Sequence, residues 1–205
     1  MRTELRERAH ELIRAELVDA AFELIVEHGY EALTAEDLAR GLGISRATFF
    51  RYLGSKDEVI VSAVLGDLDQ FAEAMRASRL DPAGSRWHRL RAAFEPAVVQ
   101  SEESAQRLRK QLRLIQSLPL VSARVRRARV PQIESLADAL VEDGADEFAS
   151  QVLATAAVAV LDQCWVRWGR DEQASLRTIL DRAFAELAAG SEPLGAGRAD
   201  ASSAP

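Results

Sequence analysis

The side chains that most often carry out catalysis show no catalytic spacing in this 205-residue sequence. Its three histidines, His10, His28 and His88, are scattered, and Cys164 is the single cysteine. We find no paired carboxylates, no serine nucleophile on a glycine-flanked turn and no glycine-rich phosphate loop. The sequence therefore predicts a protein that is not an enzyme, with no catalytic residues, no metal site and no cofactor.

The charged residues point instead to one short basic segment. The formal net charge at pH 7 is -6, which taken alone disfavours nucleic acid as a partner. Within residues 38–56, however, the charged side chains are Arg40, Arg46, Arg51 and Lys56, with no acid among them. Because a phosphate responds to the nearest face of a protein, this local surplus favours a DNA-binding surface.

The elements that would position these side chains are two short helices joined by a tight turn. Thr34 and Ser45 are typical N-cap residues, and the small Ala39 lets the helices cross closely. Gly43 tolerates the positive φ that such a turn needs. Residues 34–53 therefore predict a helix-turn-helix, against the alternative of an ordinary helical hairpin with a solvated charged face. The expected anchors are Leu38, Leu42, Ile44 and Phe49, and the outward face carries Arg46, Ala47, Thr48, Phe50, Arg51 and Tyr52.

The stretch AELVDAAFELIVEHGYEALTAEDLARGLGISRATFFRYLGSKDEVI, residues 15–60, resembles the N-terminal domain of the TetR family of transcription regulators. The matching residues are Ala20, Ala21, Gly29, Tyr30, Thr34, Leu38, Ala39, Gly43, Ile44, Ser45, Thr48, Arg51, Tyr52, Ser55 and Lys56. Two positions depart from the family pattern, because Phe50 replaces a usual tyrosine and Leu53 a common phenylalanine. The first departure removes a hydroxyl contact, although Phe50 can still pack on a thymine methyl group or a sugar.

The resemblance implies which side chains meet palindromic operator DNA. Thr34, Tyr52 and Lys56 would contact phosphates, while the start of the second helix would meet phosphates and base edges. The implied DNA-binding residues are Thr34, Ala35, Ser45, Arg46, Ala47, Thr48, Phe50, Arg51, Tyr52 and Lys56.

The rest of the chain also has the residue pattern of helices, so the expected fold class is all-α. Expected helices cover residues 14–28, 35–42, 46–53, 56–75, 85–100, 102–117, 121–142, 146–168 and 172–189, with a break at 81–85 and a kink at Pro131. The expected division is a helix-turn-helix domain at 11–71, a ligand-binding and dimerisation domain at 72–190, and a disordered tail at 191–205.

Residues 148–168 are apolar around most of the helix circumference, which predicts burial on two sides. The resemblance implies that this helix and the following one pair with a second subunit, making a homodimer. Ala154, Ala156, Ala157 and Ala159 would permit close approach. The alternative is that one subunit buries both sides.

The middle helices are expected to form a chamber for a small-molecule effector. The candidate lining residues are Trp87, Phe94, Leu112, Arg113, Ile115, Arg124, Leu136, Cys164, Trp165 and Trp168, with plain core as the alternative for each. Residues 107–127, RLRKQLRLIQSLPLVSARVRR, resemble a C-terminal subtype that includes mycofactocin-type regulators, which implies an acyl-CoA-like ligand whose phosphates the arginines of residues 107–129 could neutralise. The alternative is that these arginines are solvated.

The sequence thus predicts a repressor that a ligand releases from its operator. An activator, a constitutive repressor, or a helical ligand carrier or enzyme without DNA binding stay open as alternatives. No signal peptide is evident, and the longest apolar run, residues 152–161, is shorter than a membrane span, so we expect a cytoplasmic protein.

Overall fold

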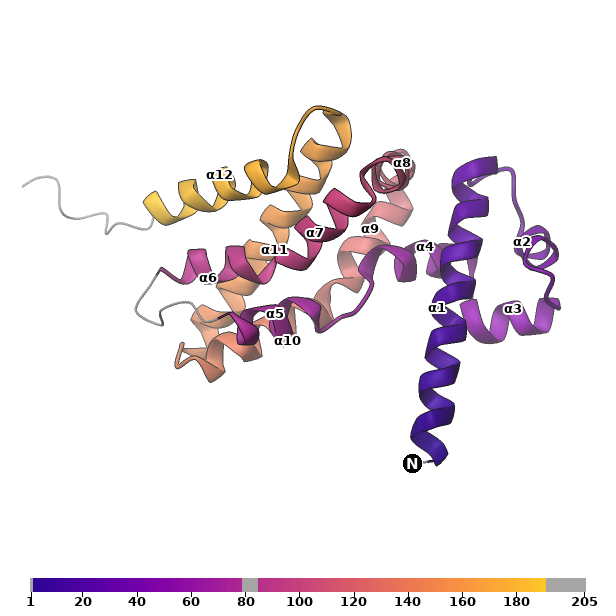
Figure 1. Cartoon of the computed structure of the whole chain (residues 1–205), viewed down its shortest axis with the longest axis horizontal. Helices are drawn as coiled ribbons and strands as arrows, with labels where there is room; N and C mark the ends of the chain where they lie inside the picture. The colour runs from indigo at the N-terminus through magenta and orange to yellow at the C-terminus, as the bar shows by residue number, and fades with distance from the viewer. Residues whose placement is uncertain (1, 79–84, 191–205) are drawn as a thin grey trace, which may run out of the picture.

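The computed structural model describes residues 2–78 and 85–190, and within these ranges it is all-helical (Figure 1). This confirms the expected fold class. The helices are α1 (Arg2–His28), α2 (Ala35–Gly41), α3 (Arg46–Leu53), α4 (Lys56–Leu65), α5 (Gln70–Ala77), α6 (Arg86–Ala93), α7 (Glu95–Glu103), α8 (Ala105–Gln116), α9 (Pro119–Ala128), α10 (Val130–Glu142), α11 (Glu147–Arg170) and α12 (Leu176–Ala189). The expected tail and most of the expected break at 81–85 lie outside the described residues.

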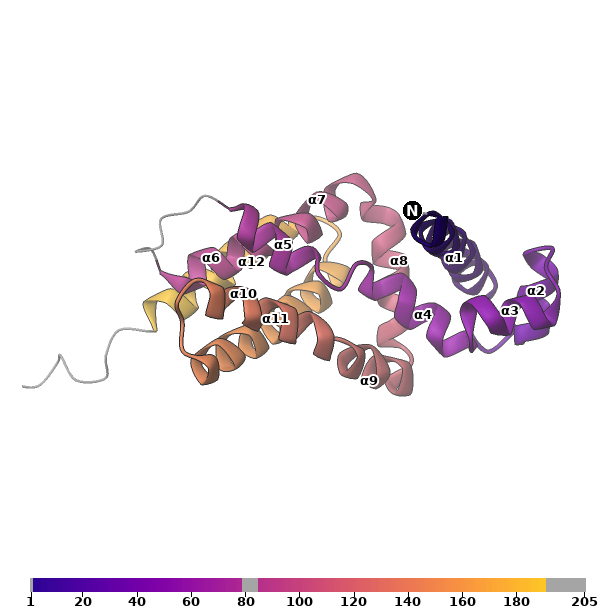
Figure 2. The same cartoon turned by 90° about the horizontal axis from the view of Figure 1, so that it is seen from below.

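Helices α1 to α3 form one end of the molecule, and α4 leads from them toward the remaining helices (Figures 1 and 2). Their core is built from fully buried apolar side chains that recur at helical spacing, such as Phe22 and Ile25 on α1. Leu38 on α2 and Phe49 on α3 pack into the same core, as expected for anchors of a helix-turn-helix.

Two expected long helices are each divided in the structure. The expected helix over 56–75 ends at Leu65, because Gly66 adopts φ 58° and ψ −139°, a conformation open essentially to glycine. The expected helix over 85–100 ends at Ala93, and Pro96 lies in the first turn of α7. Proline lacks the N–H that a continuing helix needs, but it suits a first turn.

Pro131 begins a helix rather than kinking one. The expected helix over 121–142 is two helices, α9 and α10, and Pro131 lies at the start of α10. The same preference of proline for the first helical turn accounts for the difference.

Helix α11 forms the centre of the C-terminal domain, packed against α8, α10 and α12. Ala154, Ala157 and Leu161 are fully buried there. Helix α11 is long and apolar enough to cross a membrane. The apolar run of residues 152–161, the only one considered from the sequence, is shorter than a membrane span. A core helix of a globular domain has the same length and composition, and α11 packs against α8, α10 and α12.

The two ends of the molecule share a seam at α8 and α9. Ile115, Val121 and Val125 belong to these helices but are buried in the same cluster as the apolar residues of α1 to α4. The N-terminal core is therefore completed by residues far along the chain.

Candidate DNA interface and ligand chamber

The N-terminus of α2 is fixed by a reciprocal cap between Thr34 and Asp37. Thr34 Oγ1 accepts from the Asp37 N–H at 3.1 Å, and Asp37 Oδ2 accepts from the Thr34 N–H at 3.0 Å. The side-chain hydrogen bond from Thr34, followed by its backbone N–H and by Arg40, lowers the pKa of Asp37 to about 2. Thr34 is exposed and Ala35 is half-buried at this helix end.

The turn and the cap of α3 set the direction of the second helix. Gly43 adopts φ 67°, and Ser45 Oγ accepts from the Thr48 N–H at 3.1 Å. Phe49 and Leu53 are buried against the body, so the opposite side of α3 faces outward. Of the expected contact residues on α3, Arg46, Ala47, Phe50 and Arg51 are exposed, as is the cap residue Ser45, whereas Thr48 and Tyr52 are half-buried.

The outward face of α3 carries cations supported by aromatic rings. Arg46 Nε lies 2.9 Å from Glu36 Oε1, and its guanidinium lies 5.4 Å from the Phe50 ring centroid. The Arg51 guanidinium lies 5.0 Å from the centroid of the Tyr52 ring. The His10 ring of α1 stacks on the same Tyr52 ring, with 4.5 Å between the two ring centroids. These exposed contacts are weak enough for a phosphate or base to replace.

Lys56 is placed differently from the other expected phosphate contacts. Its ammonium donates to the carbonyl oxygens of Tyr30 at 2.6 Å and Leu33 at 2.8 Å, and it lies 3.8 Å from the Tyr30 ring centroid. Lys56 therefore holds the turn between α1 and α2, a role that the sequence did not reveal.

Most of the expected ligand-lining residues lie in the core. Phe94, Leu136, Cys164 and Trp168 are buried in the C-terminal cluster, and Trp87 packs against it. Burial raises the pKa of the Cys164 thiol to about 11.

Three of the expected lining residues do line cavities, the larger of which opens to solvent beside the exposed Arg126 and Gln163. Leu112, Ile115 and Trp165 line two small neighbouring cavities of about 50 and about 100 Å³ between α4, α8 and α11. Both cavities are lined by Val64, Leu112, Arg129 and Trp165, and we call them together the interior chamber. The space amounts to roughly five water molecules, so a long ligand would have to separate these helices.

The chamber is more polar than the sequence suggested. Arg129 is 6% exposed, and its Nε lies 2.7 Å from Asp162 Oδ1. Gln111 lines the smaller cavity and Gln116 the larger one. The sequence contained one signal for this buried ion pair, because Asp162 is an acid within an otherwise apolar stretch of α11. A buried acid needs a buried cation as its partner.

The arginines of residues 107–129 mostly make specific ion pairs or caps. Arg113 of α8 lies 3.5 Å from Glu172 in the turn between α11 and α12, and Arg124 of α9 lies 2.7 Å from Asp57 of α4. Arg109 donates to the carbonyl oxygens of Trp168, Asp171 and Ala174 beyond the end of α11. Arg109 thereby ties α8 to the end of α11, whereas the side chains of Arg113 and Arg124 are 46% and 59% exposed, as the solvated alternative expects.

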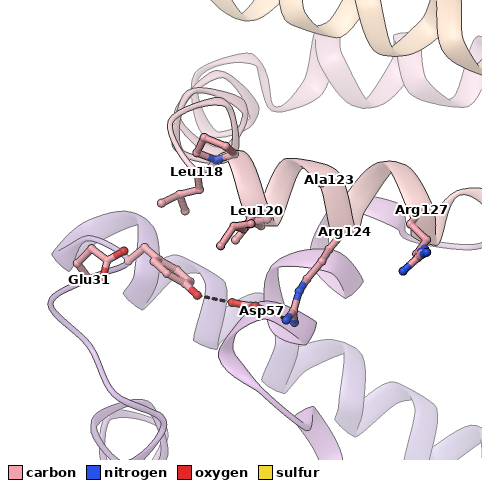
Figure 3. Close-up of a pocket in the computed structure, with 10 residues that line it drawn as sticks. Glu31, Asp57, Leu118, Leu120, Ala123, Arg124 and Arg127 are labelled. Carbon is pink, nitrogen blue, oxygen red and sulfur yellow. Dashed lines mark hydrogen bonds and ion pairs between the residues drawn. The ribbon is translucent and has the colours of Figure 1, made fainter.

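Arg124 also lines an open groove of about 580 Å³ between α9 and the N-terminal domain (Figure 3). Figure 3 shows Leu118 and Leu120 above the groove, Arg124 reaching toward Asp57, and the hydrogen bond between Tyr30 and Asp57. Burial and then this hydrogen bond raise the pKa of Tyr30 to about 12. Asp57 thereby joins the α1–α2 turn to α9.

Comparison with known proteins assigns both domains. Residues 17–63 match the bacterial regulatory proteins of the tetR family, and residues 84–192 match the MftR C-terminal domain. A putative mycofactocin biosynthesis transcriptional regulator, MftR of Mycobacterium tuberculosis, is 30% identical over 182 residues, covering 86% of this chain and 89% of that protein. The chain therefore belongs to the tetR family and carries an MftR-type C-terminal domain.

Solved structures show the same fold. FadR of Thermus thermophilus, a transcriptional repressor in complex with lauroyl-CoA, has a TM-score of 0.59 at 21% identity, covering 92% of this chain and all of that chain (100%). FadR of Bacillus subtilis in complex with stearoyl-CoA has a TM-score of 0.58 at 17% identity, covering 86% of this chain and 98% of that one. The expected family resemblance is confirmed, and the protein is a DNA-binding transcriptional regulator whose relatives are regulators rather than enzymes.

Proposed function

We propose that the protein is a homodimeric repressor of the cytoplasm that binds a palindromic operator on nucleoid DNA and leaves it when an effector binds. The observation that carries the proposal is the outward face of α3, where Arg46, Phe50 and Arg51 are exposed on a helix that Phe49 and Leu53 anchor. A short, rigidly capped helix with such a face fits the major groove.

The DNA contacts fall into two groups. Arg46, Ala47 and Thr48 at the start of α3, together with Phe50, are placed to read bases. Thr34, Ala35, Ser45, Arg51, Tyr52 and Lys56 surround them and would position the helix on phosphates. The half-buried Lys56 acts mainly through the α1–α2 turn that it holds.

The test is selection of bound duplexes from a random pool, followed by affinity measurements on the selected operator. Arg46→Ala should lose roughly 1–3 kcal/mol of discrimination at particular base pairs, because a bidentate contact to a base edge is removed. Arg40→Ala is the matched control, since Arg40 is equally exposed but lies on α2 and is paired with Asp37. If no sequence is enriched, or if the Arg46→Ala protein discriminates between base pairs of the operator as strongly as the unmodified protein does, the interface is wrongly placed.

The surface that fits a second subunit is the outer face of α11 and α12. Phe148, Val152 and Ala159 are exposed at helical spacing along α11, and Phe148 is 78% exposed. A groove of about 720 Å³ between the two helices continues this face. Exposed apolar side chains in a continuous stripe are typical of a protein interface.

The effector that these features favour has an apolar body and an anionic head, as an acyl-CoA has. The solved FadR structures with lauroyl-CoA and stearoyl-CoA support this class through a shared fold. Arg124 is better placed than Arg113 for an anionic head, because it lines an open groove that is large enough for one. Each buried methylene contributes about 0.8 kcal/mol, so operator release should sharpen with acyl chain length until the chamber is filled.

Operator release by acyl-CoA esters of increasing length tests this part. Arg124→Gln should weaken the response to the esters more than Arg113→Gln does. A flat response across the series, with release by neutral aromatic compounds, would contradict the acyl class and leave the DNA-binding assignment intact.

A further inference from the structure

A line of buried polar contacts crosses the C-terminal domain beside the interior chamber. Arg129, between α9 and α10, pairs with Asp162 of α11 at 2.7 Å, and its Nη1 donates to Gln132 Oε1 at 3.0 Å. Gln132 is 1% exposed, and its Nε2 donates to the Leu65 carbonyl oxygen at the end of α4, also at 3.0 Å. The line therefore runs from α11 through Arg129 to the helix that carries the DNA-binding domain.

Arg129 is not fully satisfied by this arrangement. Its Nε is buried beside Asp162 but makes no hydrogen bond of good geometry, and Gln116 Nε2 is a second buried nitrogen without a partner among the described residues. Both residues line the larger cavity of the chamber. A buried donor without an acceptor, at Gln116, and a poorly aligned one, at Arg129, indicate a place where another acceptor can bind.

Asp162 is a replaceable partner for Arg129. Burial raises the pKa of Asp162, and the charges of Arg129 and Arg126 offset only part of the increase, so its carboxylate is held at a cost. Arg126 lines the same cavity and is exposed, so a displaced Asp162 has a second cation nearby. A ligand carboxylate that took the place of Asp162 would keep Arg129 paired.

We propose that the interior chamber is a carboxylate site in which Arg129, assisted by Gln116, binds the head of an apolar carboxylic acid in competition with Asp162. The apolar part lies against Leu112 and Trp165, which line both cavities. The head is a bare carboxylate, because one carboxylate can pair with Arg129 and accept from Gln116. The apolar tail, like any long ligand, has to separate the helices around the chamber. This inference rests on the proposed ligand chamber and adds the link through Gln132 to the end of α4.

The test compares dodecanoate with 1-dodecanol, using tryptophan fluorescence and calorimetry on the full-length protein. Asp162→Asn removes the competing carboxylate, so dodecanoate should bind on the order of tenfold tighter or better while dodecanol changes little. Adding Arg129→Gln to Asp162→Asn should abolish the preference for the acid. Weaker or unchanged dodecanoate binding by a folded Asp162→Asn protein would overturn the site.

A measurement on the unmodified protein covers the case in which the variants do not fold. On the unmodified protein at pH 8, dodecanoate should bind on the order of tenfold more tightly than its methyl ester, because only the acid carries a charge that Arg129 can pair with. Equal binding of the acid and the methyl ester contradicts the proposal.

The outcomes separate this site from the proposed function. If dodecanoate behaves as expected but neither it nor lauroyl-CoA lowers operator affinity, the site stands and effector-controlled release fails. If lauroyl-CoA releases the operator while dodecanoate shows no dependence on Asp162, release stands and the carboxylate site is refuted.

Discussion

Lys56 shows how a single residue can serve the DNA interface from behind it. Its ammonium joins the carbonyl groups of Tyr30 and Leu33, which lie in the turn that delivers Thr34 to the start of α2. Removing the ammonium leaves two carbonyl oxygens with one donor fewer in a half-buried site. We therefore expect the residue to affect DNA binding through the shape of the turn as well as through charge.

Lys56→Met should lower the free energy of unfolding by roughly 1–3 kcal/mol, the cost of leaving buried acceptors unsatisfied. Affinity should fall similarly for operator and unrelated duplexes, because no base contact is lost. Urea unfolding and fluorescence anisotropy measure the two effects. Lys110→Met is the matched control, since Lys110 is exposed on α8. Unchanged stability with reduced affinity would mean that the ammonium serves phosphate alone.

Cys164 is expected to be chemically inert in the native protein. Its side chain is 3% exposed, and burial raises its pKa to about 11, so the reactive thiolate is scarce at pH 8. Alkylation by iodoacetamide at pH 8 should be slow for the folded protein and fast in urea, where both burial and the raised pKa are lost. Rapid native alkylation would show that α11 opens readily around this residue.

At the scale of elements, the break between α4 and α5 separates the last helix of the DNA-binding domain from the next helix of the C-terminal domain. Gly66 makes the break, and the Gln70 and Gln132 side chains donate to the carbonyl of Leu65, which the helix itself leaves free. The direction in which α4 leaves the C-terminal domain therefore depends on this one turn.

Gly66→Ala should destabilise the protein by about 1–3 kcal/mol, because alanine is strained at the backbone angles of this position. Thermal unfolding measures the loss. Gly190→Ala is the control, since Gly190 has an ordinary φ of −73° and should tolerate a side chain. Equal melting temperatures for Gly66→Ala and the unmodified protein would show that the chain can run straight from α4 into α5.

The sequence predicted the helix-turn-helix well because its signals are local. The caps at Thr34 and Ser45 and the turn at Gly43 depend on neighbours within a few residues. The chamber was predicted poorly, because Arg129 and Asp162 are brought together by packing of α10 against α11 and have no shared sequence motif. Apolar residues such as Phe94 and Leu136 were expected to line it, but periodicity identifies a buried face without telling core from cavity.

At the scale of the whole molecule, the two faces of α11 differ in burial, and we expect only the exposed one to meet a second subunit. Ala154 and Ala157 face the core of their own subunit, whereas Ala159 is exposed on the stripe that contains Phe148 and Val152. The four alanines expected at a subunit contact thus divide between the two faces. This division allows the assembly and the fold to be perturbed separately.

Ala159→Glu should dissociate the dimer while leaving the helical content unchanged, because the new charge meets the partner rather than the core. Ala157→Glu should unfold the subunit, since Ala157 is fully buried. Sedimentation velocity at micromolar concentration and circular dichroism distinguish the two results. A monomeric unmodified protein would rule out the dimer, and a dimeric Ala159→Glu protein would place the contact elsewhere.

The seam at α8 and α9 limits how this regulator can be recombined with others. Ile115, Val121 and Val125 complete the apolar core of the DNA-reading end although they lie some fifty residues or more beyond α4 in the chain. In a hybrid protein joined after α4, the core of the DNA-binding domain would therefore be covered by α8 and α9 of a different protein. Operator specificity should be exchanged between relatives most successfully when α8 and α9 are transferred together with the DNA-binding domain, or when only the exposed side chains of α3 are replaced.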